Sequence, residues 1–203
     1  MDFKELAENR RSVKYFDKDK DVDLDTIKKI INLATYSPSA FNLQPWSIIA
    51  VRSEEAKKRL YKLADEQSKI LKASTTLIMI GDRTGFEEYN PVWKRVEDKL
   101  GSEKKEIILK ANRKLYGETE EKRIKFGELN TGLLAMSIMY SASYYGVDSH
   151  PVGGIDAKGI KEEFNIEGNK HVVMLICLGH FNEEKTMKPR KHRKKFEDFV
   201  EIV

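Results

Sequence analysis

The segment from 129 to 145 is the strongest constraint on how this 203-residue chain folds. Its apolar residues occur almost all the way round a helix rather than along one stripe: Leu129, Leu133, Leu134, Ala135, Met136, Ile138, Met139, Tyr140 and Ala142. A helix that is apolar on every side must be covered on every side. We therefore expect a central buried helix that ends near Gly146, with part of its cover supplied by a second subunit.

Amphipathic helices and apolar strands are predicted around this segment. Helices are expected over residues 2–10, from a cap at Asp23 or Asp25 to Ala34, over 53–66 and over 156–164. Strands are expected over residues 46–51, 75–80 and 171–178, where β-branched and other apolar residues run continuously. Residues 149–154 read as a turn of small residues.

Residues 83–123 differ in character from the rest of the chain. They are heavily charged and are interrupted by Pro91, Gly101 and Gly117. Two short helices are predicted there, near 91–100 and 103–115, without a second apolar core. We expect a single domain over 1–203, with a helical excursion or lid at about 83–123, because an independent domain needs more contiguous apolar surface.

Composition excludes several classes of protein. The net charge of +4 is mild and does not by itself indicate nucleic-acid binding. Cys177 is the single cysteine, so neither a disulfide framework nor a cysteine-based metal cluster is possible, and we expect it to be buried and inert. The four histidines lack metal-ligand spacing. No signal segment or membrane span is present, so a soluble, cytoplasmic protein without a metal is expected.

The loop at 37–46, Ser-Pro-Ser-Ala-Phe-Asn-Leu-Gln-Pro-Trp, joins a predicted helix to a predicted strand. Its two prolines fix φ and restrict the residues before them, which should hold Ser39, Asn42 and Gln44 in defined directions. Rigid loops with hydrogen-bonding groups are typical of binding sites for polar ligands. The alternative is an ordinary capped turn between a helix and a strand.

Cations cluster near both ends of the chain. Arg10, Arg11 and Lys14 lie beside Ser12, and a helix C-terminus accounts for only one of these cations. A basic run follows at 188–195, and its apolar continuation, with Phe196, Phe199, Val200 and Val203, is expected to dock on the protein. With the rigid loop and the Gly-Gly turn at 153–154, these cations suit an anionic, aromatic cofactor that carries the reactivity itself. Signatures of hydrolases, metalloproteases and Walker-type nucleotide binding are absent.

Four motifs occur in a characteristic order: Arg-Arg-Ser-Val-Lys-x-Phe from Arg10, Pro-Ser-Ala-x-Asn-x-Gln-Pro-Trp from Pro38, Gly-Gly-Ile-Asp from Gly153 and Pro-Arg-Lys-x-Arg from Pro189. In order and spacing the chain resembles the FMN-dependent nitroreductase family over nearly its whole length. The first two motifs are specific in combination, whereas the latter two indicate the family mainly by position. The resemblance implies an α+β fold with a mixed, mostly antiparallel sheet flanked by helices around a central helix. It also implies an intertwined homodimer with FMN at each of two interface sites.

The resemblance places flavin contacts at fourteen positions: Arg10, Arg11, Ser12, Lys14, Pro38, Ser39, Asn42, Gln44, Lys69, Val152, Gly153, Gly154, Lys191 and Arg193. By position, Arg10, Lys191 and Arg193 would hold the phosphate, and Lys14 would lie nearer the pyrimidine edge. The loop from Pro38 would come from the partner subunit. The backbone at Gly153 and Gly154 would lie at the flavin N5, and Lys69 would be a cation beside the ring.

The implied reaction passes a hydride from NADH or NADPH through flavin N5 to a nitroaromatic, a quinone or a similar electron-poor acceptor, with ping-pong kinetics. One alternative is other chemistry on the same fold, such as reductive dehalogenation or flavin reduction or fragmentation, which turnover of a halotyrosine against a nitroaromatic would separate. Another is a nucleic-acid or regulatory protein that uses the 188–195 run. That reading requires a solvent-exposed tail and binding that weakens steeply with salt, and a colourless purified protein would support it.

Overall fold

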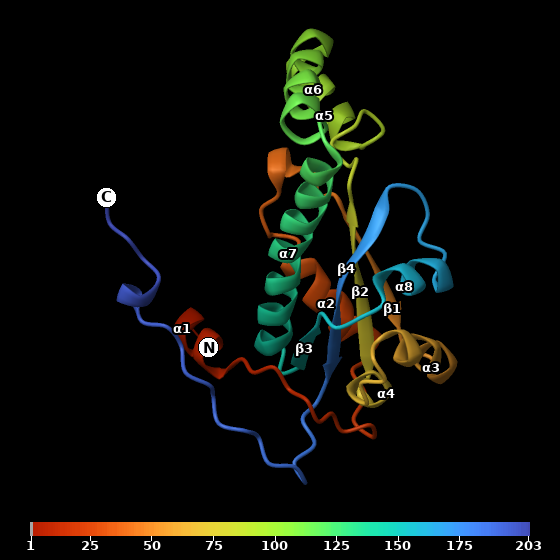
Figure 1. The fold of residues 1–203 in the computed structure, drawn as a ribbon, viewed down its shortest axis with the longest axis vertical. Coiled ribbons are helices and arrows are strands. Elements are labelled where there is room, and N and C mark those ends of the chain that lie inside the picture. The colour runs from red at the N-terminus through yellow and green to blue at the C-terminus, as the bar shows by residue number, and fades with distance from the viewer. Residues whose placement is uncertain (1) are drawn as a thin grey trace.

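The computed structural model describes residues 2–203 and combines helices with one four-stranded sheet (Figure 1). The helices are α1 (Phe3–Asn9), α2 (Leu24–Ala34), α3 (Glu54–Leu63), α4 (Lys69–Lys72), α5 (Val92–Leu100), α6 (Ser102–Tyr116), α7 (Glu120–Tyr144) and α8 (Ala157–Glu163), with 3-10 turns η1 (Ala40–Asn42) and η2 (Phe196–Asp198). The strands are β1 (Trp46–Val51), β2 (Thr75–Asp82), β3 (Asp148–Val152) and β4 (Lys170–Gly179). No described helix is both long and apolar enough to span a membrane.

The sheet has the order β1-β2-β4-β3, and neighbouring strands pair antiparallel throughout. Among residues 2–203, parallel pairing is limited to an isolated bridge between Ser12 and Ser149, at the outer edge of β3. Side chains alternate between the two faces: Leu77 and Met79 of β2 point to one side, and Ile78 points to the other. Both faces are covered, which explains why β2 and β4 read as continuous apolar runs.

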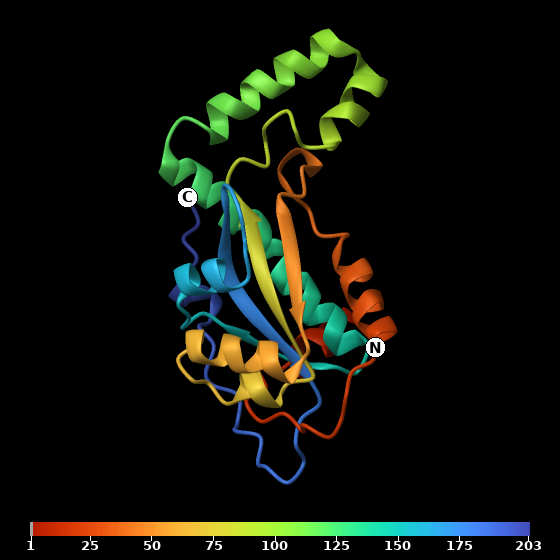
Figure 2. The ribbon, with the colours of Figure 1, turned by 90° about the vertical axis from the view of Figure 1, so that its right-hand side faces the viewer.

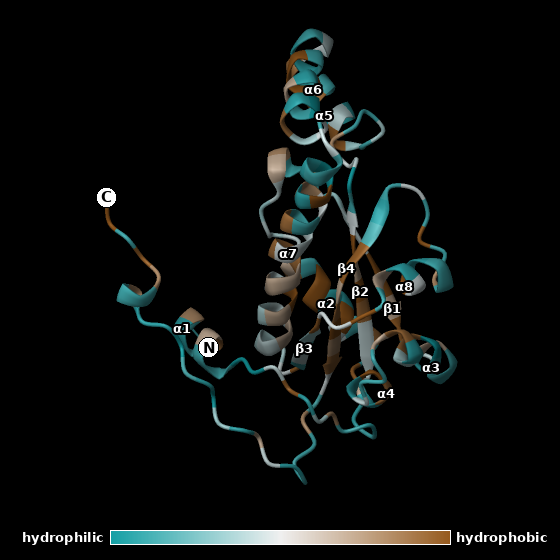
Figure 3. Cartoon of the chain, in the orientation of Figure 1, coloured by the Kyte–Doolittle hydropathy of each residue, from teal (hydrophilic) through white to brown (hydrophobic). Residues whose placement is uncertain are grey.

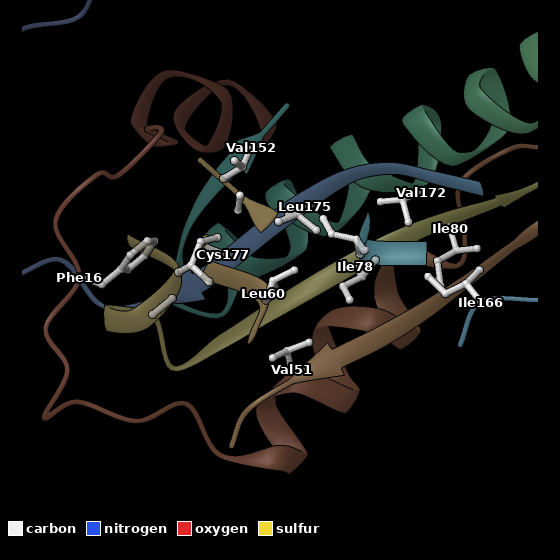
Figure 4. Packing of buried hydrophobic residues seen from close by; sticks show 14 of the residues in the cluster. Phe16, Val51, Leu60, Ile78, Ile80, Val152, Ile166, Val172, Leu175 and Cys177 are labelled. Carbon is white, nitrogen blue, oxygen red and sulfur yellow. The ribbon is translucent and has the colours of Figure 1, made fainter. Parts of the chain in front are cut away.

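Helices α3, α4 and α8 lie on one face of the sheet, and α2 and α7 lie on the other (Figure 2). The first face carries a buried cluster that includes Phe16, Leu60 and Cys177, whose side chains converge above β2 and β4 (Figure 4). Cys177 is fully buried, as expected, and burial raises the pKa of its thiol to about 11. The predicted fold class is confirmed.

Helix α7 starts about nine residues earlier than expected. Its first turns are charged, with Glu120 and Glu121 next to the cap Thr119, so the apolar pattern that marks the rest of the helix is missing there. One side of α7 packs on the sheet and on α2 through residues such as Leu134 and Ile138. The opposite side leaves Leu129 60% exposed within a single chain.

Helices α5 and α6 form the excursion, which projects beyond the sheet in Figure 1. A third buried cluster holds its base, with Phe86, Trp93 and Leu109 packed against Leu43 and Phe126. The expectation of a segment without an apolar cluster is therefore wrong. The cluster is shared with the body of the protein, however, because Phe126 belongs to α7 and Leu43 to the loop before β1.

Two further expectations are corrected. Residues 148–152 form strand β3 rather than a turn, because Pro151 is tolerated on a strand at the edge of a sheet. The apolar end of the tail does not dock on its own chain: Phe196 is 56% exposed and Phe199 is 67% exposed. Figure 1 shows the tail passing α1 and running away from the body.

Gly127 of α7 permits close contact with His171 at the start of β4. A Cβ atom at Gly127 would lie 2.7 Å from Cε1 of His171. We expect Gly127→Ala to destabilise the protein by about 1–3 kcal/mol in urea unfolding, because the core is overpacked. In a His171→Ala background the same change should stabilise α7 by up to about 1 kcal/mol, since the clash is gone and alanine favours helix. Equal effects in both backgrounds would contradict this contact.

Candidate functional site

A hollow of about 230 Å³ lies where the N-terminal segment meets the C-terminal tail. Its lining is Arg10, Arg11, Ser12, Lys14, Tyr15, Thr186, Met187, Lys188, Pro189, Arg190, Lys191 and Arg193. Seven of these residues are cations, and no carboxylate of the described residues lines the hollow. The two ends of the chain thus build one strongly positive site, which we call the cation hollow.

Hydrogen bonds from arginines hold the tail against the N-terminal segment. Arg190 donates to the backbone carbonyl of Arg10 at 3.0 Å and also to the carbonyl of Glu8. Arg11 donates to the carbonyl of Lys188. Figure 3 colours most of this part of the tail as hydrophilic. These contacts bring Lys191 and Arg193 beside Arg10.

The cations of the hollow are not neutralised within the chain. No ion pair found among residues 2–203 involves any of the seven. Burial lowers the pKa of Arg10, and the charges of Arg190, Arg193 and Arg11 lower it further. Clustered like charges raise the free energy of the folded state unless an anion joins them. The hollow is therefore built to receive an anion, and arginine suits a phosphate in particular.

A second group of basic residues lies alongside, where the chain after Ser12 runs next to β3. The backbone N–H of Val13 donates to the carbonyl of Ser149 at 3.0 Å. Burial and the nearby charge of Lys69 lower the pKa of His150 to about 4. Burial and the charge of Lys14 lower the pKa of Lys69. Lys14, Lys69 and His150 are thus neighbours, brought together from three separate segments.

The Gly-Gly turn follows β3 directly and is tied to the turn between α3 and α4. Lys69 donates through Nζ to Oε1 of Gln67 at 2.6 Å, and Nε2 of Gln67 donates to the carbonyl of Gly154 at 2.9 Å. A Cβ at Gly153 would meet nothing within 4 Å, so the space above this residue is open. The predicted residues Lys69, Val152, Gly153 and Gly154 therefore lie close to one another.

The loop at 38–44 does not line the cation hollow. It packs on α7 instead: the backbone N–H of Ala40 donates to Oδ1 of Asn130 at 2.8 Å. Ser39 accepts at Oγ from the backbone N–H of Gln44 at 3.0 Å. Three non-glycine residues of the loop have positive φ, namely Phe41, Asn42 and Gln44. Such strain persists only where surrounding contacts hold it and is concentrated at functional sites.

Within one chain the predicted site residues thus form two separate sets. Arg10, Arg11, Ser12, Lys14, Lys191 and Arg193 meet at the hollow, with the group around Lys69 and Gly154 alongside. Pro38, Ser39, Asn42 and Gln44 lie apart from them in the loop before β1, where Pro38 adjoins α7 and Gln44 lines a separate hollow with Asp82 and Tyr89. Sequence reasoning missed Arg190, Gln67 and His150. Arg190 was present in the basic run, but no spacing pattern identifies Gln67, whose partner lies 87 residues away.

Comparison with known proteins now adds to this geometry. The family model described as the nitroreductase family matches residues 7–180. The chain belongs to the nitroreductase family. The expected family is confirmed, and with it an enzyme of the oxidoreductase class.

Relatives share the chain's full length. A Bacillus subtilis protein named as an NAD(P)H nitroreductase, MhqN, is 30% identical, and the match covers 100% of this chain and 99% of that protein. An enone reductase of conjugated linoleic acid biosynthesis from Lactiplantibacillus plantarum is 26% identical over 98% of this chain and 94% of its own. The crystal structure of a nitroreductase from Exiguobacterium sibiricum in complex with FMN has a TM-score of 0.86 at 25% identity, covering 100% of this chain and 98% of that one.

The lowered pKa of His150 predicts that the protein loses stability in acid. The unfolded chain binds a proton at His150 below about pH 6.5, whereas the folded chain does so only near pH 4, because burial and Lys69 disfavour the imidazolium. The free energy of unfolding should therefore fall as the pH drops through this window. In urea titrations, His150→Gln should show a smaller fall than the wild type, and His192→Gln, on the exposed tail, should match the wild type. An unchanged fall in His150→Gln would contradict the assignment.

Proposed function

We propose that this chain is an FMN-dependent oxidoreductase that uses NADH or NADPH to reduce electron-poor acceptors such as nitroaromatics and quinones. The observation that carries the proposal is the cation hollow, which holds seven cations and no carboxylate in a chain of the nitroreductase family. A flavin mononucleotide offers both a dianionic phosphate and a planar ring. The residues present fit the two parts.

The phosphate fits the cation hollow. Arg10, Lys191 and Arg193 converge there, and a phosphate would relieve the repulsion that lowers the pKa of Arg10. Arginine forks and lysine point charges both suit phosphate oxygens. Arg11 lines the same hollow, and its bond to the Lys188 carbonyl keeps the tail in place. Ser12 adds a hydroxyl at the rim, which we assign to the cofactor as well.

The ring fits the segment from Lys14 to Gly154. Bound FMN supplies hydride transfer at N5, from NAD(P)H to the acceptor. With the ring bound here, Lys14 and Lys69 would supply positive charge to the reduced ring, an example of preorganised electrostatics. The main chain after Val152 would offer N–H groups to the ring, and the open space at Gly153 would leave the approach free. No acid–base side chain is needed, because the cofactor carries the reactivity.

We further propose that the site is completed by a second copy of the chain. The loop carrying Pro38, Ser39, Asn42 and Gln44 cannot belong to the same cation hollow, since it packs on α7 away from it. The exposed side of α7 forms a broad, mostly apolar hollow with this loop, lined in part by Pro38, Leu129, Leu133 and Met136. The apolar end of the tail is also exposed. An intertwined homodimer would cover all three surfaces.

The acceptor would bind under the excursion formed by α5 and α6, which we assign as the lid of a single domain over 1–203. The relatives differ in the acceptor that their names state, including a nitroreductase and an enone reductase. Turnover with a nitroaromatic, a quinone, an enone and free flavin would rank the candidate acceptors.

We also propose the cytoplasm as the location of the protein.

The phosphate assignment is tested by the flavin content of purified protein. We expect Arg10→Ala and Arg193→Ala to weaken FMN binding by roughly tenfold or more each, because each removes a charge-assisted hydrogen bond. Lys194→Ala is the matched control, since Lys194 adjoins Arg193 but does not line the hollow. Absorbance of the bound flavin and titration of apoprotein with FMN give the values. Yellow protein with wild-type FMN content in both arginine variants would refute the assignment.

The two-subunit site is tested by a charge on the apolar side of α7. Leu133 is 40% exposed there, and Leu133→Glu should place a carboxylate in an apolar interface. We expect a shift to monomer in sedimentation velocity, accompanied by loss of FMN, while the circular dichroism spectrum is retained. Leu24→Glu is the control, because Leu24 is 57% exposed in the first turn of α2. A Leu133→Glu monomer that binds FMN like the wild type would overturn the shared site.

A further inference from the structure

The turn between α3 and α4 is strained in a way that its own sequence does not require. Asp65 has φ 51° and Glu66 has φ 49°, so two consecutive non-glycine residues adopt the left-handed region. Aspartate tolerates this conformation, whereas glutamate has no such preference. Backbone strain of this kind persists where the surrounding structure requires a particular path of the chain. This path of the chain places Gln67, the next residue, beside Gly154.

Gln67 joins two parts of the site that are far apart in sequence. Its Oε1 accepts from the ammonium of Lys69, and its Nε2 donates to the carbonyl of Gly154. A second contact fastens the same two segments, because the backbone N–H of Asp156 donates to the carbonyl of Leu63 at 2.7 Å. The end of α3 and the turn after it therefore hold the Gly-Gly segment at two points, Gly154 and Asp156.

We propose that Gln67 is a positioning residue of the flavin site, which holds the Lys69 ammonium and the Gly153–Gly154 main chain as one rigid unit. This inference rests on the function proposed above. Through Lys69, Gln67 would tune the reduction potential of the flavin. Through Gly154, it would set the direction of the main-chain groups that face the ring.

An amide side chain can hydrogen-bond to both Lys69 and the Gly154 carbonyl. Lysine needs an acceptor and a carbonyl needs a donor, and the two ends of glutamine supply one of each. A carboxylate at position 67 would hold Lys69 but repel the Gly154 carbonyl, and a cation would do the reverse. The groups that face Lys69 are Lys14, His150 and the buried Cys177, none of which is an anion that could replace Gln67. Without its acceptor, Lys69 is repelled by its neighbours and should move toward solvent.

The first test is the midpoint potential of bound FMN in the full-length protein. In Gln67→Met, which loses both hydrogen bonds, and in Lys69→Met we expect the potential to become more negative than in the wild type. The shift in the double variant should be smaller than the sum of the two single shifts, because part of the effect of Gln67 passes through Lys69. Gln67→Glu should also shift the potential negatively, since its carboxylate cancels the charge of Lys69. Lys72→Met, an exposed lysine of the same short helix, is the control and should leave the potential unchanged.

The second test does not depend on flavin. At about pH 5.5 the imidazole of His150 should be neutral in the wild type and partly protonated in Lys69→Met and Gln67→Met, as seen in ¹⁵N spectra of the imidazole groups, because the repelling ammonium has gone or moved away. His150→Gln assigns the signal. Gln67→Ala, which also removes both hydrogen bonds, serves as the second variant if Gln67→Met fails to fold.

The outcomes separate the two proposals. A wild-type chain that takes up no FMN would refute the proposed function, and the role of Gln67 with it. A Gln67→Met protein that binds FMN with the wild-type potential and a neutral His150 would refute only the role of Gln67. Additive shifts of the potential in the double variant would also refute it, since they would show that Gln67 does not act through Lys69.

Discussion

The packing of α7 is the constraint on which the rest of the structure depends. This helix lies across one face of the sheet with α2 beside it, supports the excursion through Phe126 and anchors the loop before β1 through Asn130. Phe126, Asn130, Leu134 and Ile138 follow one another at intervals of four residues, so these contacts lie on one side of the helix at successive positions along its length. The part that carries Leu129 and Leu133 stays exposed among residues 2–203. A second copy of the chain is the partner that we propose for it, and the loop from Pro38 adjoins that same surface.

Electrostatics organises the other half of the site. The N-terminal segment and the tail both carry positive charge and therefore repel each other. They are held together by arginine side chains that donate hydrogen bonds to backbone carbonyls, rather than by ion pairs. These bonds leave the positive charge of the hollow uncompensated. A phosphate is the ligand that we propose for the hollow, and it would also stabilise the contact between the two chain ends.

Much of the local structure could be predicted from the sequence because it depends on short-range patterns. Strand β1 lies at its predicted bounds, and the cap Asp23 and the two helices of the excursion also match. The errors have tertiary causes. Strand β3 contains Pro151 and is recognisable as a strand only through its place at the edge of the sheet. The first turns of α7 are charged because they lie beyond the sheet, and Phe199 finds no cover within its own chain.

By itself, the sequence determined the family, the fold and the set of cations and amides available to a cofactor, because motif order and hydrophobic periodicity are local properties of the chain. The tertiary structure alone decided which of these groups meet. It placed Lys191 and Arg193 beside Arg10 and kept the loop from Pro38 apart from them. It also joined Gln67 to Gly154 across 87 residues. Such contacts depend on how helices and strands pack against one another, and no pattern of neighbouring residues encodes them.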